Sequence, residues 1–176
     1  RSLTQTTPVG RSGAVKRTYS LTTIKFEVIM SYMSVSAIIL AGGKGTRMES
    51  DVPKPLHKIA SKALLDWTLE KLDFLSLEQT IVVVGYQGEE IISKITRFGI
   101  EWAVQPKQVG NADALGCGLS KLSDKTDTIL VLQADDSSFY KPGTLRRFIE
   151  VHQSKSAVIS LLSVEKADDT PRFRID

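Results

Sequence analysis

Short apolar runs recur along the chain from residue 34 onward, each followed by polar residues or glycine. Three of them, at residues 37–40, 81–84 and 129–132, have the composition and length of strands that are buried on both faces. We therefore predict that they form central strands of a parallel sheet. A short strand is also predicted at 102–104, and a last one at 157–164.

The segments between these runs have apolar residues at the spacing that is typical of helices. Apolar residues recur at helical spacing over residues 64–72 and again from residue 91 to Phe98. Two more helices are predicted at 111–122 and 144–151, the second opened by Pro142 and Gly143. Strands that alternate with helices indicate an α/β domain with right-handed crossovers, and such sheets bind ligands at the carboxyl ends of their strands.

Composition limits the chain to one ordinary domain with an N-terminal leader. The 176 residues are 41% hydrophobic, which suffices for one core. The net charge of +3 comes from residues 1–34, which hold five basic residues and one acid. The rest of the chain therefore lacks the excess of positive charge that is typical of nucleic-acid-binding proteins. No apolar run reaches the roughly 20 residues of a membrane span. The single cysteine, Cys117, excludes an internal disulfide.

The leader differs in composition from the domain that follows. Residues 1–26 are rich in Arg, Ser and Thr and lack acids, which fits either an organelle transit peptide or an upstream translation artefact. We favour the artefact and a cytoplasmic location. We expect residues 1–33 to be disordered and residues 34–176 to be the N-terminal part of the functional domain.

The stretch LAGGKGTRMESDVPKPLHK follows the first predicted strand and carries the main candidate chemistry. A P-loop would need Ser or Thr after its lysine, whereas Lys44 precedes Gly45. A dinucleotide fingerprint would need a third glycine at Met48 and a helix directly after the glycines. Pro53 and Pro55 instead predict extended backbone at the residue before each, Lys54 included. With both of these motifs excluded, we interpret the stretch as a glycine loop. Its N–H groups can approach phosphates, and its basic residues add positive charge.

This stretch resembles the signature of the sugar-nucleotide pyrophosphorylases, and most closely the uridylyltransferase domain of GlmU-type enzymes. The similarity continues at VVVGYQGEEI, QPKQVGNADAL and LVLQADD, and covers residues 36–164 in the same order and spacing. It implies a Rossmann-like three-layer sandwich with a mostly parallel sheet, of the nucleotide-diphospho-sugar transferase type. The family continues beyond PRFRID, so we expect the domain to be truncated at its C-terminus.

The resemblance implies a role for individual residues. Arg47 would contact the leaving pyrophosphate, and Lys54 would approach the α-phosphate, where negative charge grows during transfer. Nucleotide contacts are implied for the loop residues Leu40, Ala41, Gly42, Gly43, Lys44 and Gly45.

Base recognition and metal binding are implied further along the chain. Gln105 would both donate to a uracil carbonyl and accept from its ring N–H, with Gly110 and Asn111 completing the pocket. Gln133 and Ala134 would also contact the nucleotide. The family pattern places the Mg²⁺ carboxylate at Asp135, although the spacing to later residues favours Asp136.

The implied reaction is transfer of UMP from UTP to a sugar 1-phosphate, N-acetylglucosamine 1-phosphate first, with release of pyrophosphate. Partners would be these two substrates and Mg²⁺, without nucleic acid or membrane, and the oligomeric state is left open. Two alternatives remain: a nucleotidyltransferase with another base (CTP or GTP) or acceptor, and a nucleotide-binding protein without catalysis.

Overall fold

A four-stranded parallel sheet forms the centre of the protein in the computed structural model, which describes residues 3–6, 16–19, 33–45 and 50–163. Its strands, β3 (Val35–Leu40), β6 (Gln79–Val84), β7 (Ile100–Val104) and β8 (Thr128–Gln133), lie in the order β7-β6-β3-β8. Ile38 of β3 pairs with Ile81 of β6 and Val131 of β8. The predicted parallel sheet is confirmed.

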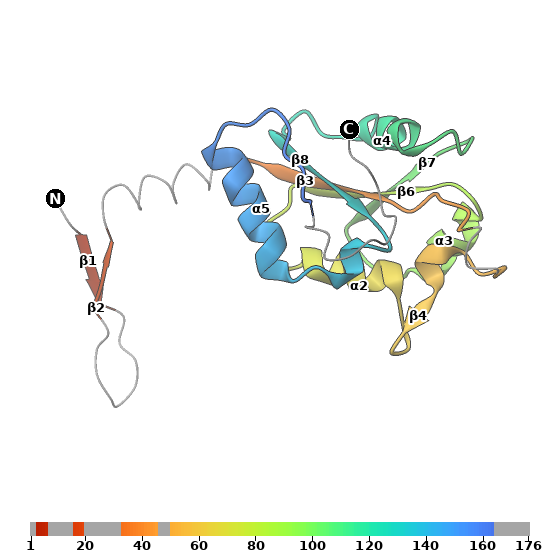
Figure 1. The fold of residues 1–176 in the computed structure, drawn as a ribbon, viewed down its shortest axis with the longest axis horizontal. Helices are drawn as coiled ribbons and strands as arrows, with labels where there is room; N and C mark the ends of the chain where they lie inside the picture. Colours follow the sequence, from red (N-terminus) through yellow and green to blue (C-terminus); the bar gives the residue numbers. More distant parts are fainter. Residues whose placement is uncertain (1–2, 7–15, 20–32, 46–49, 164–176) are drawn as a thin grey trace, which may run out of the picture.

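Helices cover both faces of this sheet, so the predicted three-layer α/β architecture is confirmed as well. One face carries α4 (Asn111–Leu119), and the other carries α2 (Leu64–Leu72), α3 (Gly88–Lys94) and α5 (Pro142–Ser154) (Figure 1). The remaining described elements after residue 33 are short: a β4–β5 ladder (Lys58–Ile59 with Lys62–Ala63) and the 3-10 helices η2 (Lys54–Leu56) and η3 (Ser137–Phe139).

Alternation along β3 divides the core between these layers. Ala37 and Ile39 pack on the side of α2, α3 and α5, whereas Ile38 and Leu40 pack on the side of α4. All six residues of β3 are buried, because the strand has a neighbour on each edge and helices on both faces. The end of this strand is therefore a rigid base for the loop that follows it.

Three predictions about strands and helices are wrong. The segment 157–163 is not a strand: it pairs with no strand of the described residues, and Val158 and Ile159 are 94% and 77% exposed. Residue 164, the last of the predicted strand, lies outside the described residues. An apolar run becomes a strand only where a ladder partner satisfies its backbone. Among the described strands, the run at 129–132 forms the edge strand β8 rather than a central one, and Val131 is 43% exposed. Phe98 lies beyond α3, which ends when Ile95 turns to extended backbone.

The described part of the leader is a short antiparallel ladder between β1 (Leu3–Thr6) and β2 (Lys16–Tyr19). Composition predicts disorder for all of residues 1–33; apart from Met33, the other leader residues lie outside the described part, and the domain boundary at residue 33 stays a prediction. None of the helices in the described residues is long and apolar enough to cross a membrane.

Candidate active site

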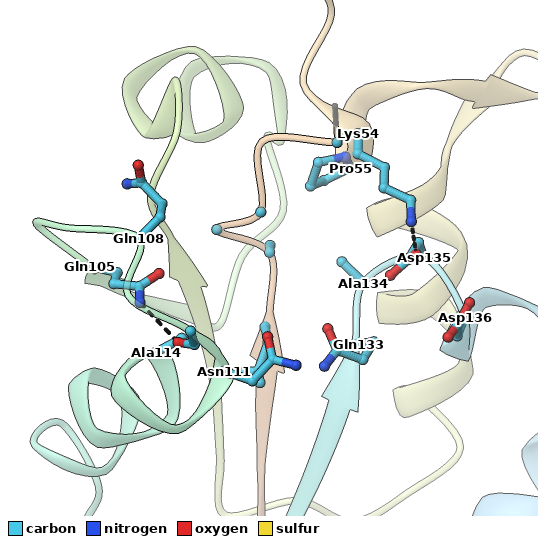
Figure 2. Close-up of a pocket in the computed structure, with 16 residues that line it drawn as sticks. Lys54, Pro55, Gln105, Gln108, Asn111, Ala114, Gln133, Ala134, Asp135 and Asp136 are labelled. Atoms are coloured by element: carbon cyan, nitrogen blue, oxygen red, sulfur yellow. Dashed lines mark hydrogen bonds and ion pairs between the residues drawn. The ribbon is translucent and has the colours of Figure 1, made fainter. Parts of the chain in front are cut away.

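The carboxyl ends of the strands surround one cavity of about 610 Å³. The glycine loop after β3 runs between Gln105 and Gln108 on one side and Lys54 and Asp135 on the other (Figure 2). Most of the residues predicted from the sequence line this cavity: Leu40, Ala41, Gly42, Gly43, Gly45, Lys54, Gln105, Gly110, Asn111, Gln133, Ala134, Asp135 and Asp136. Arg47 lies outside the described residues.

Gly42 is the tightest point of the loop. The preceding residue, Ala41, is anchored by its N–H, which donates to the Val83 carbonyl at 2.8 Å. A Cβ added to Gly42 would lie 3.0 Å from Gln105 Oε1 and 3.2 Å from the Gly85 nitrogen. The ends of β3, β6 and β7 can approach one another only because this residue has no side chain.

The second half of the loop faces Lys54. Gly45 has φ +62°, which favours glycine, and a Cβ there would lie 3.1 Å from Lys54 Cβ. Lys44, by contrast, is exposed, and its ammonium lies 5.4 Å from the centre of the Tyr86 ring. It does not line the cavity, although the sequence predicted it beside the glycines.

Lys54 begins η2 and is not extended, so that local prediction is wrong. The Leu56 N–H donates to the Pro53 carbonyl at 2.8 Å and closes a single helical turn. A residue before proline usually avoids helical backbone. Here the turn buries Pro55 and Leu56, and this burial outweighs that preference. Lys54 is thereby held at the cavity wall.

Asp135 forms an ion pair with Lys54 across the cavity floor. The Ala134 N–H donates to the Leu40 carbonyl at 3.1 Å, which fixes the end of β8 against the end of β3. The Asp135 side chain is 22% exposed, while the neighbouring Asp136 is exposed. Asp135 is thus the carboxylate aimed at the lysine, and Asp136 lies at the rim.

Gln105 occupies the opposite wall, directly after β7. It is 4% exposed, and its Nε2 donates to the Gly110 carbonyl at 3.1 Å and to Asp113 Oδ2 at 2.8 Å. An amide nitrogen has only two hydrogens, so the expected donation from Gln105 to uracil does not fit this arrangement. Gly110 has φ +131°, a conformation that glycine adopts easily.

Two polar residues beside this wall were not predicted from the sequence. Gln108 lines the cavity, and a Cβ on Gly85 would lie 3.0 Å from its Nε2. Asp113, in the first turn of α4, accepts the hydrogen bond from Gln105. Both lie in the stretch QPKQVGNADAL. Its polar residues, which recur before the predicted helix and in its first turn, were the sequence feature that could have indicated them.

The carboxylates fit a divalent cation that is shared with a substrate. In the described part of the chain, no group of three or more His, Cys, Asp or Glu side chains could hold a metal alone. Mg²⁺ often takes one or two protein carboxylates and completes its shell with water and substrate phosphates. Asp135, with Asp136 adjacent and the glycine loop opposite, offers that donor set.

Comparison with known proteins identifies the domain. The model of the MobA-like NTP transferase domain matches residues 37–171. The chain belongs to this family. This nucleotidyltransferase domain is 36% identical over 131 residues to the bifunctional protein GlmU of Pelobacter propionicus, which covers 74% of the chain and 28% of that protein. GlmU of Corynebacterium aurimucosum is 35% identical over 146 residues, or 80% of the chain and 30% of that protein.

The nucleotidyltransferase domain thus spans less than a third of the length of these curated relatives, and its resemblance to GlmU-type proteins is confirmed. Solved structures agree on the fold. Rv0371c of Mycobacterium tuberculosis, in complex with manganese, aligns with a TM-score of 0.59 at 21% identity, covering 69% of this chain and 61% of that one. The 4-diphosphocytidyl-2C-methyl-D-erythritol synthase of Anaerococcus prevotii aligns with a TM-score of 0.58 at 20% identity, covering 70% and 52%.

Proposed function

We propose that this nucleotidyltransferase domain transfers UMP from UTP to a sugar 1-phosphate, with N-acetylglucosamine 1-phosphate as the first acceptor to test. A phosphate oxygen of the sugar forms a bond to the α-phosphorus of UTP, and the bond from that phosphorus to the bridging oxygen of pyrophosphate breaks. The products are a UDP-sugar and pyrophosphate. The identity to GlmU proteins supports this choice of substrates.

One observation carries the proposal: Lys54 and Asp135 meet at the cavity that the glycine loop and Gln105 enclose. Phosphoryl transfer places extra negative charge on the phosphate oxygens, and fixed positive charge stabilises it most effectively when it is already in position. Lys54, held by η2, would supply that charge at the α-phosphate. The backbone N–H groups of the glycines and the absence of their side chains would admit the phosphates.

Mg²⁺ is the proposed cofactor, with Asp135 as its protein ligand and Asp136 as the alternative. Bound there with the triphosphate, it would neutralise phosphate charge. Asp135 would position the cation, and Lys54 would be left to contact phosphate. Arg47, outside the described residues, keeps its predicted role at the leaving pyrophosphate. We also propose a cytoplasmic location, with nucleotide and sugar phosphate as the partners.

The test measures pyrophosphate release with N-acetylglucosamine 1-phosphate, Mg²⁺ and either UTP, CTP or GTP. We expect UTP to give the fastest turnover, and Lys54→Met and Asp135→Asn to lower kcat/KM by about a hundredfold or more. Lys94→Met is the matched control, because Lys94 is exposed on α3 and pairs with Glu90 away from the cavity. Equal rates in Lys54→Met and the parent chain would sink the assignment.

The same measurement separates the alternatives. Faster turnover with CTP or GTP would identify a nucleotidyltransferase with another base, and turnover only with another sugar phosphate would change the acceptor. Nucleotide binding without any pyrophosphate release would favour a binding protein without catalysis.

A further inference from the structure

The orientation of the Gln105 amide is fixed by two acceptors. Its Nε2 lies 2.8 Å from Asp113 Oδ2 and 3.1 Å from the Gly110 carbonyl. A flipped amide would place the carbonyl oxygen against both acceptors, where it would repel them and leave its hydrogens unused. Gln105 is 4% exposed, so water has little access to its Nε2, although Asp113 itself is exposed. The carboxylate of Asp113, together with the Gly110 carbonyl, therefore determines which end of the amide the cavity receives.

The end that remains is the carbonyl oxygen. Gln105 Oε1 is turned toward the glycine loop (Figure 2), and a Cβ on Gly42 would lie only 3.0 Å from it. A carbonyl oxygen only accepts hydrogen bonds. Any base edge that meets Gln105 must therefore present an N–H group.

We propose that Asp113 is a specificity-determining positioning residue, which locks Gln105 so that the nucleobase meets an acceptor alone. Uracil offers a ring N–H at N3, whereas cytosine has a lone pair at that atom and, in the same position, would set two acceptors face to face. Cytosine could donate to Gln105 Oε1 only through its exocyclic amine, for which the base would have to shift along its edge. The inference deepens the proposed function and rests on it. It replaces the two-sided contact between Gln105 and uracil that the sequence suggested.

Asp113 acts through Gln105 and does not itself touch the base in this scheme. A purely structural role is the competing explanation, because an acid in the first turn of α4 also interacts favourably with the helix dipole. The two roles differ in what Asp113→Asn does. Its side-chain carbonyl can still accept from Gln105 Nε2, so positioning survives, but the charge that interacts with the dipole is lost. Asp113→Leu removes both.

The experiment is calorimetric titration of the whole chain with UTP and with CTP in the presence of Mg²⁺, for the parent, Asp113→Leu and Asp113→Asn. We expect the parent to prefer UTP, Asp113→Leu to reduce that preference about tenfold, and Asp113→Asn to retain most of it. Asp124→Leu, a change at an exposed acid away from the cavity, is the matched control. Equal weakening of both nucleotides by Asp113→Leu, with the preference unchanged, overturns the positioning role.

A second measurement needs no nucleotide. The side-chain amide resonances of Gln105, assigned by their loss in Gln105→Leu, should exchange slowly with water in the parent and in Asp113→Asn, and faster in Asp113→Leu. Equal exchange in all three would overturn the proposal even if a variant lost affinity through partial unfolding. A folded parent that binds no nucleotide, yet shows the expected exchange pattern, would contradict the proposed function and leave the Asp113–Gln105 lock standing as a structural fact alone.

Discussion

Single atoms decide the shape of the site at the residue scale. Gly42 lacks the Cβ that would collide with Gln105, and Gly45 has the positive φ that brings the loop back over Lys54. Neighbouring residues of the same loop differ: Gly43 has open space around its Cα, and Lys44 lies over Tyr86. The glycines of this loop therefore have different structural roles, although they look alike in the sequence.

Gly42 and Gly43 should respond differently to alanine. We expect Gly42→Ala to cost about 1–3 kcal/mol of unfolding free energy, because the new methyl group meets the Gln105 amide and the Gly85 backbone. Gly43→Ala should stay within about 0.5 kcal/mol, since a Cβ there meets nothing within 4 Å. Urea unfolding measures both, and similar losses in the two variants would contradict the packing seen at Gly42.

Lys54 and a divalent cation should compete for Asp135 in the absence of nucleotide. Removing the ammonium in Lys54→Met should tighten Mn²⁺ binding by about two- to fivefold, the range of a partly exposed ion pair. Asp135→Asn should abolish the same binding. Electron paramagnetic resonance of free Mn²⁺ gives both affinities, and unchanged binding in Asp135→Asn would transfer the ligand role to Asp136.

Helix α4 connects the core to the base wall at the element scale. Its N-terminal turn carries Asn111 and Asp113, and its far end packs on β3 and β6 through Gly118. A Cβ on Gly118 would lie 2.7 Å from Ile38 Cγ2 and 3.0 Å from Val83 Cγ2. The helix can lie this close to the sheet because Gly118 has no side chain. The distance between α4 and the sheet in turn determines the position of Asp113.

Two glycines of α4 form an internal comparison. Gly116→Ala should stabilise the protein by about 0.5–1 kcal/mol, because a Cβ there meets nothing within 4 Å and alanine favours helix. Gly118→Ala should destabilise it by about 1–3 kcal/mol through contact with the sheet, and should weaken UTP binding as α4 shifts. Thermal unfolding with and without UTP measures both effects; stabilisation by both substitutions would contradict the close approach of α4.

The layers cover the sheet unequally at the scale of the whole molecule. The face opposite α4 is closed by three helices, whereas α4 packs on β3, β6 and β7, and no helix of the described residues covers the same face of β8. Within β8, Leu130 and Leu132 are 3% and 5% exposed, and Ile129 and Val131 are 37% and 43% exposed. The same apolar strand therefore has one core face and one exposed face.

Substitutions on the two faces of β8 should separate these environments. Leu132→Ala should cost about 2–5 kcal/mol of unfolding free energy, since it empties a filled position of the core. Val131→Thr should change it by no more than about 0.5 kcal/mol, because the side chain is already half in water. Chemical denaturation tests the pair, and a loss above 2 kcal/mol in Val131→Thr would mean that this face is covered in solution.

The sequence by itself determined the alternation of strands and helices, the parallel sheet, and the glycine loop with its lysine and carboxylates, because these features depend on local periodicity and on residue type. It did not determine which strand would be at the edge, since an apolar run has the same pattern whether or not a neighbour covers it. Tertiary structure alone decided that residues 157–163 pair with no other described segment, that Lys54 sits in a helical turn against Asp135, and that Asp113 and Gly110 orient the Gln105 amide. Each of these depends on which distant atoms come within contact distance, and that is a property of the packed molecule.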